Sequence, residues 1–131
     1  MTVPFWCLIL VFIIPYVLAG VGAFQRKAQL GFIDNKNWRA NQLHELTGFA
    51  SRCYSAQANT WEAIAMFTAA VCVAHFAGAD AQQSANAAML FLAARVTHTL
   101  LYLADLDKIR TVAFLVGWGS CIWLFVLAIQ A

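Results

Sequence analysis

Four polar side chains recur along one stretch of the sequence in a pattern that fits a single helix face. Arg52, Ser55, Asn59 and Glu62 are separated by three, four and three residues, and residues so spaced lie on the same side of an α-helix. An ionisable group at bilayer depth costs about 2.5–3.5 kcal/mol on insertion scales. This row is therefore expected to face a bundle interior or a subunit interface, where it could hold a small polar ligand.

A second polar row follows in the next apolar stretch. Arg95, His98 and Tyr102 are spaced by three and four residues and again share one helix face. Arginine, histidine and tyrosine can bind an anion, move a proton or donate a hydrogen bond. Two such rows on neighbouring helices could together line one polar site.

The rise of a helix sets the heights at which the two rows meet. At about 1.5 Å per residue, Glu62 and Arg95 both lie roughly 15–20 Å from the cytoplasmic ends of their helices. Antiparallel packing then predicts an ion pair between them at the base of a pocket that opens to the cytoplasm. The same count places Asn59 near His98, Ser55 near Tyr102, and Arg110 at the mouth. A buried Glu–Arg pair can also simply fasten two helices together, and that alternative stays open.

The composition indicates which elements position these rows. The chain is 63% hydrophobic and only 11% charged, with a mean hydropathy of +0.71, whereas soluble domains carry about 25% charged residues. A helix of about 20 apolar residues spans a bilayer. We therefore predict an all-α fold, in which residues 1–131 form a single integral membrane four-helix bundle. The predicted helices span about residues 3–24, 49–77, 84–104 and 110–129.

The first apolar segment has a competing interpretation as a cleaved signal peptide, because Val21 and Ala23 suit a peptidase site. A signal peptide carries its positive charge before the apolar run, whereas Arg26 and Lys27 follow it. The pattern favours a membrane span.

The charges of the connections predict the orientation of the bundle. Positively charged loops stay in the cytoplasm, and the basic residues gather in the first and third connections, while the second has none. They are Arg26, Lys27, Lys36 and Arg39 in the first connection, and Lys108 and Arg110 in the third. Both termini are then expected on the non-cytoplasmic side. The net charge of +2 and the lack of a basic run with aromatics disfavour nucleic acid as a partner.

The four cysteines do not suggest a metal centre. Cys7, Cys53, Cys72 and Cys121 form no C-x-x-C pair, and each lies in or beside an apolar segment. Free, packed thiols are expected rather than disulfides or metal ligands, and no metal is predicted.

Taken together, the two rows resemble the MAPEG family, the membrane-associated proteins in eicosanoid and glutathione metabolism. The resemblance is carried by Asn-x-x-Glu at Asn59 and Glu62, and by Arg-x-x-His-x-x-x-Tyr from Arg95 to Tyr102. It extends over nearly the whole chain, and it implies a homotrimer that binds glutathione between neighbouring subunits near the cytoplasmic face. Many members of the family are bacterial, and a bacterial chain would lie in the inner membrane.

The resemblance also implies roles for individual residues. Asn59 and Glu62 match residues that hold glutathione, with Glu62 meeting the glutamyl amine. Arg110 approximates the family arginine that stabilises the thiolate, and Tyr102 could add a hydrogen bond. The further residues matched to the glutathione site are Gln57, His98, Arg95, and Arg26 of an adjacent subunit.

Ser55 departs from the family pattern. Eukaryotic members have an arginine at this position that grips a glutathione carboxylate, and a serine supplies neither its charge nor its fork of donors. Arg52, one turn earlier on the same face, is the candidate replacement.

The resemblance implies thiolate addition to a lipophilic electrophile, or reduction of a peroxide, at a site that such a substrate reaches from the lipid. Two alternatives remain: a non-catalytic protein whose polar rows hold a trimer together, and a binder of another small anionic or lipidic ligand.

Overall fold

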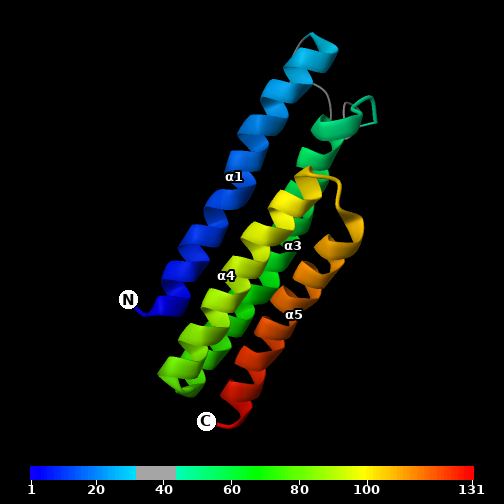
Figure 1. Ribbon diagram of the computed structural model, residues 1–131. Coiled ribbons are helices and arrows are strands. Elements are labelled where there is room, and N and C mark those ends of the chain that lie inside the picture. Colours follow the sequence, from blue (N-terminus) through cyan, green and yellow to red (C-terminus); the bar gives the residue numbers. More distant parts are fainter. Residues whose placement is uncertain (32–43) are drawn as a thin grey trace.

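The computed structural model describes residues 1–31 and 44–131. In this part of the chain there are four α-helices and no strand: α1 (Val3–Leu30), α3 (Gly48–Ala77), α4 (Ala81–Leu103) and α5 (Asp107–Ile129). The helices run alternately up and down, so both termini lie at the end of the bundle that holds the α3–α4 connection (Figure 1). The predicted all-α four-helix bundle is confirmed, while the side of the membrane on which the termini lie stays a prediction.

The first helix is longer than the apolar pattern indicates. It continues from the expected residue 24 to Leu30 because glutamine, arginine, lysine and alanine are all good helix formers. It stops at Gly31, whose φ of 77° is a left-handed conformation that glycine adopts without strain. Arg26 is therefore a helical residue rather than part of a loop. Lys36 and Arg39, which the orientation argument also used, lie outside the described residues.

The two short connections are fixed by local hydrogen bonds. Asp80 begins α4, because its carboxylate Oδ1 accepts from the backbone N–H of Gln83 at 2.7 Å and so caps the helix. Asp105, between α4 and α5, has a φ of 64°. A non-glycine residue adopts this left-handed conformation at a cost, and aspartate is among those that tolerate it best.

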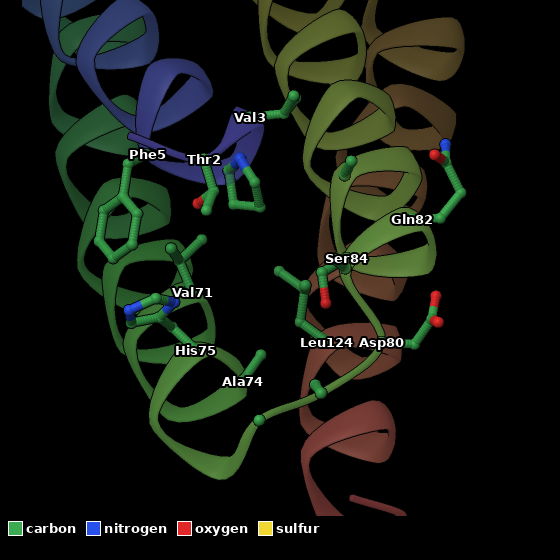
Figure 2. A pocket seen from close by; sticks show the side chains of 15 residues that line it. Thr2, Val3, Phe5, Val71, Ala74, His75, Asp80, Gln82, Ser84 and Leu124 are labelled. Atoms are coloured by element: carbon green, nitrogen blue, oxygen red, sulfur yellow. The ribbon is translucent and has the colours of Figure 1, made fainter.

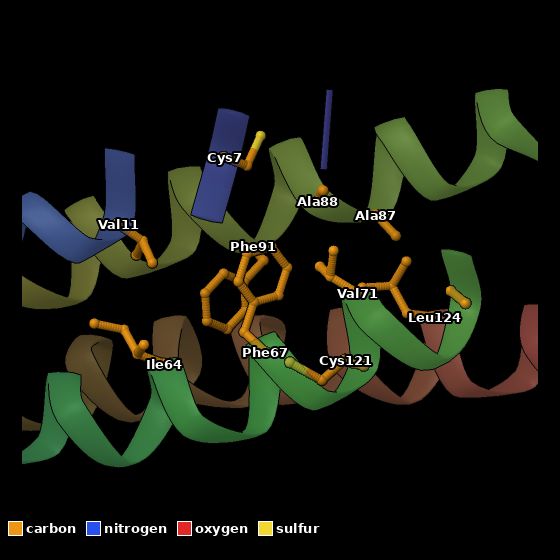
Figure 3. Packing of buried hydrophobic residues seen from close by; sticks show 12 residues of the cluster. Cys7, Val11, Ile64, Phe67, Val71, Ala87, Ala88, Phe91, Cys121 and Leu124 are labelled. Atoms are coloured by element: carbon orange, nitrogen blue, oxygen red, sulfur yellow. The ribbon is translucent and has the colours of Figure 1, made fainter. Parts of the chain in front are cut away.

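The core lies where the four helices meet. Phe67 of α3 and Phe91 of α4 stack face to face, with ring centroids 3.9 Å apart and planes 9° from parallel. Val11, Leu124 and other apolar side chains surround this pair (Figure 3). All four cysteines are free, as predicted; Cys7, Cys53 and Cys121 are buried, and Cys72 is partly buried.

The outer surface is apolar, as a membrane span requires. Large exposed side chains run along α1 and α5, among them Ile13 at 51% and Leu115 at 56% exposure. Three helices, α1, α3 and α5, are long and apolar enough to cross a bilayer. The fourth, α4, carries Arg95 and His98 and is less apolar than these three. α3 and α4 each pack against both α1 and α5, which puts the two polar rows on the central pair of helices.

Candidate functional site

Arg95 is the most buried charged side chain of the described residues. Only 1% of it is exposed, and its Nη2 donates to the Asn59 Oδ1 at 2.9 Å and to the Thr60 Oγ1 at 3.4 Å. The Thr60 hydroxyl in turn donates to the Ala56 carbonyl oxygen at 2.7 Å. Gly117 of α5 lies beside the arginine, and a Cβ there would make an ordinary van der Waals contact with the Arg95 Cδ at 3.6 Å.

The predicted ion pair between Glu62 and Arg95 is wrong. Among the described residues, the salt bridge is instead the one between Arg52 and Asp105, and Asn59 meets Arg95 where Glu62 was expected. The register is shifted by about one helical turn. The depth of Arg95 was counted at helical rise from Lys108. The helix α4 ends at Leu103, however, and the residues that follow form a turn.

The two rows nevertheless meet at one cavity. A space of about 200 Å³, here called the inner cavity, is lined by Asn59 and Glu62 from α3 and by Arg95 from α4. Its other walls are apolar: Ala63, Met66, Phe91, Phe114, Gly117 and Trp118. The site is thus polar on one side and lipophilic on the other, whereas the sequence suggested a wholly polar pocket.

A second cluster lies towards the α4–α5 turn. The guanidinium carbon of Arg110 lies 4.0 Å from the centroid of the Tyr102 ring, within the range of a cation–π contact. His98 packs edge-on to the same ring, with centroids 5.6 Å apart. His98 is 3% exposed, and its Nδ1 has no hydrogen-bond partner in the described structure. Arg110 and Tyr102, the two residues to which the family resemblance assigns the thiolate, therefore lie in contact.

Arg52 holds the turn between α4 and α5. Its Nε donates to the Leu103 carbonyl oxygen at 3.1 Å, and its Nη1 lies 3.3 Å from the Asp105 Oδ2. Arg52 does not line the inner cavity. Its guanidinium satisfies an otherwise free carbonyl at the end of α4 and fixes the turn that leads to Arg110.

Replacing Arg52 should destabilise the protein more than replacing its exposed partner Asp105. Arg52→Met is expected to lower the free energy of unfolding by about 1–2 kcal/mol, because a carbonyl bond and an ion pair are both lost. Asp105→Asn removes only the ion pair, whose carboxylate is 71% exposed, and should cost less than about 1 kcal/mol. Thermal unfolding in detergent, followed by circular dichroism, measures both. Equal losses in the two variants would show that the carbonyl bond contributes nothing.

Three of the predicted site residues stand apart from both clusters. Ser55 is exposed and Gln57 is half-buried, and neither lines the inner cavity. Arg26 is 6% exposed and lies with its guanidinium 6.0 Å from the centroid of the Tyr54 ring. Tyr54 is on a different face of α3 from Glu62, so one copy of the chain does not bring Arg26 to the polar row.

Glu62 is exposed on the outside of the single bundle although it lies near the middle of α3. Its neighbours on that face are small and also exposed: Ser55, Ala58, Ala65 and Ala69. A carboxylate facing hydrocarbon is costly, and small residues allow another helix to approach closely. This face of α3 therefore has the features of a contact with another helix.

Sequence reasoning missed Thr60 and the clamp function of Arg52. Thr60 sits one residue from the polar row, and only its burial against α4 makes it a partner of Arg95. The sequence gives no direct signal for either role.

Comparison with known proteins adds one finding. Residues 3–130 match the model of the MAPEG family, which covers nearly the whole chain. No curated protein matches the sequence.

Proposed function

The chain belongs to the MAPEG family, and from this premise we propose that it is a membrane-bound glutathione transferase or peroxidase acting on lipophilic electrophiles. The observation that carries the proposal is the Arg110–Tyr102 contact at 4.0 Å, on the same pair of rows that supplies Glu62 and Arg95 to the inner cavity. The family also includes members with other activities, so the activity is the part that experiment must test.

The chemistry follows from the charge of Arg110. Glutathione supplies a thiol, and the thiolate, not the thiol, is the nucleophile. A guanidinium beside the sulfur favours the negatively charged form, and the Tyr102 hydroxyl can donate a hydrogen bond to it. Glu62 is suited to the ammonium of the glutamyl part, since it is a carboxylate with no cation within salt-bridge distance among the described residues. The thiol proton leaves to water.

Apolar walls suit the second substrate. The inner cavity is bounded by Phe114 and Trp118 of α5 and Met66 of α3, and α5 is exposed to lipid along much of its length. A lipophilic electrophile can therefore reach the cavity from the bilayer without crossing water.

The exposed Glu62 face and the separate Arg26 support assembly of more than one copy. Arg26 lies on the α1 side of α3, against Tyr54, and Glu62 on another face. If the polar row of one copy meets the α1 side of the next, the two surfaces differ, and such an interface forms a ring when the rotation from copy to copy closes. We propose a homotrimer, as the family resemblance implies, in which Arg26 is contributed to the site by the adjacent subunit and Gln57 is a further glutathione contact. Native mass spectrometry tests it, and a stable monomer would exclude it.

The location proposed for the protein is the inner membrane of a bacterium. The compact length and the alanine-rich helices support it. Fractionation of the source cell would test this placement.

The decisive experiment is a titration of the purified protein with glutathione, watched by ultraviolet absorbance of the thiolate and by thermal shift. Binding with thiolate formation is expected. Binding without thiolate formation would favour a ligand-binding protein instead. No binding would remove glutathione from the proposal.

One residue tests the identity of the ligand directly. Ser55→Arg restores the arginine of eukaryotic relatives and should tighten glutathione binding about tenfold, because a charge-assisted hydrogen bond contributes about 1.5–3 kcal/mol. Ser55→Lys is the matched control, since it adds the charge without the bidentate fork, and it should gain less. Isothermal titration calorimetry measures both variants. Unchanged affinity in both would argue that no carboxylate of the ligand comes near this position.

A second candidate function is favoured by one observation. The Arg95–Asn59 hydrogen bond joins α4 to α3 inside the bundle, as a purely structural fastener would. A protein with this role only would show neither glutathione binding nor thiolate formation, while Asn59 variants would still unfold more easily.

A further inference from the structure

A cavity that the proposed chemistry does not involve lies at the opposite end of the bundle from Arg110. It has a volume of about 770 Å³, within the range of small-molecule sites. We call it the terminal cavity, and Figure 2 shows it below the first turn of α1, between the end of α3 and the start of α4. The proposed glutathione chemistry uses none of its residues.

The terminal cavity is not filled by side chains because of where the helices end. The α3–α4 connection projects beyond the first residues of α1 (Figure 1), so the hairpin has no α1 partner at its tip. The residues that line the hairpin side are small, and they leave the space unfilled: Ala74, Gly78, Ala79, Ala81 and Ala85.

One buried polar group in the wall lacks a partner. Ser84 is only 7% exposed, and its Oγ makes no hydrogen bond in the described structure. In Figure 2 its hydroxyl lies on the inner side of α4 beside Leu124. A buried hydroxyl is nearly always paired with protein, water or ligand, so the Ser84 hydroxyl is free to bind a ligand oxygen in the terminal cavity.

The start of α1 supplies further donors. The first N–H groups of a helix have no acceptor within the helix, and the Thr2 side chain does not cap them. Val3 and Phe5 of this first turn line the cavity, and each has such an N–H group, while Pro4 has none. The positive end of the helix dipole lies there too, which favours an anionic oxygen.

The charged groups around the terminal cavity should repel a bound anion only weakly. The titratable side chains that line it are His75 of α3 and Asp80 before α4. The Asp80 carboxylate is engaged with the Gln83 N–H, and Figure 2 shows its side chain, like that of Gln82, directed outward. His75 packs edge-on to Phe5, with ring centroids 5.1 Å apart. A ring N–H of His75 can donate to an anion.

A lipophilic strip leads away from the cavity along α1. Val3, in the cavity wall, is 43% exposed, and large exposed side chains continue on the same helix face at spacings of three and four. They are Trp6, Leu10, Ile13 and Val17. Acyl chains could lie along this strip while a polar head occupies the cavity.

We propose that the terminal cavity binds the head group of a membrane glycerophospholipid, with its phosphate oxygens at the first turn of α1 and a head-group or ester oxygen on the Ser84 hydroxyl. The acyl chains lie on the strip from Val3 to Val17. The lining residues include no lysine or arginine, which suits a singly charged phosphodiester held by neutral donors rather than a free phosphate dianion.

Lipid titration of the full-length protein tests this assignment. The protein is purified in an alkyl maltoside, delipidated, and titrated with phosphatidylglycerol, with bound lipids counted by native mass spectrometry. One phosphatidylglycerol per chain is expected to bind more tightly than diacylglycerol, which has the same chains and no phosphate. Equal binding of the two lipids would overturn the role of the phosphate. Tighter binding of oleate would assign the site to a carboxylate and likewise overturn the proposal.

Two variants localise the lipid. Ser84→Ala should weaken phosphatidylglycerol binding about three- to tenfold, because one hydrogen bond is lost, and Ala85→Leu should abolish it by filling the space. Ser120→Ala is the matched control: Ser120 is 1% exposed, but its hydroxyl bonds to the Val116 carbonyl oxygen in its own helix. If Ser84→Ala and Ala85→Leu bind lipid as the control does, the terminal cavity is not the site.

Discussion

Replacing Arg110 with alanine should slow turnover about 100- to 1,000-fold, the usual effect of removing one group that stabilises charge at a reacting atom. The loss should appear as a smaller thiolate absorbance at neutral pH and as a shift of the pH profile for activity to higher pH. Both changes follow if the guanidinium of Arg110 favours the ionised sulfur. Stopped-flow absorbance with glutathione measures the thiolate, and steady-state kinetics measures turnover.

Two further variants separate the charge from the contact with Tyr102. Arg110→Lys keeps the positive charge but not the flat guanidinium that lies over the ring, so it should retain part of the thiolate signal. Tyr102→Phe keeps the ring and removes only the hydroxyl, and its effect should be about tenfold or less. A wild-type pH profile in Arg110→Ala would remove Arg110 from the mechanism, even if activity fell.

The largest effect on stability is expected at Asn59. Replacing Asn59 with leucine removes the acceptor of the 2.9 Å hydrogen bond from Arg95 and leaves a guanidinium that is 1% exposed without its main partner. Stranding a buried charge costs about 3–5 kcal/mol. Thermal unfolding of the detergent-solubilised protein should therefore begin well below the wild-type temperature.

Removing the charge as well should restore most of that stability. In the double variant Asn59→Leu with Arg95→Met, two apolar side chains of similar size replace the polar pair, and such replacements are often neutral or stabilising. Thr60→Val is the control for the longer contact at 3.4 Å, and its cost should be smaller. If the double variant is as unstable as Asn59→Leu alone, packing rather than charge explains the loss. If the double variant is stable but inactive, Asn59 and Arg95 are needed for activity and not only for folding.

The fold was largely predictable from the sequence because two strong signals agreed. Four apolar stretches of spanning length and a low content of charge are enough to indicate a membrane helical bundle. Helix ends were less predictable: the apolar pattern stops before Arg26, whereas the helix stops where Gly31 permits a left-handed turn.

The site was predictable in its residues but not in its pairings. Spacing identified the faces that carry Asn59, Glu62, Arg95 and Tyr102, since periodicity depends only on helix geometry. The partner of Arg95 depends on where α4 ends, and the turn at Asp105 moved the register by about one turn. A polar side chain next to the row, such as Thr60, becomes a partner only through that register.

The stacked rings of Phe67 and Phe91 divide the interior of the bundle into two compartments. With 3.9 Å between the ring centroids, no water or small molecule passes between the rings, and buried apolar side chains surround them. A lipid head group bound in the terminal cavity should accordingly have no kinetic effect at the other site. It should change neither the apparent affinity for glutathione nor the saturation curve for glutathione.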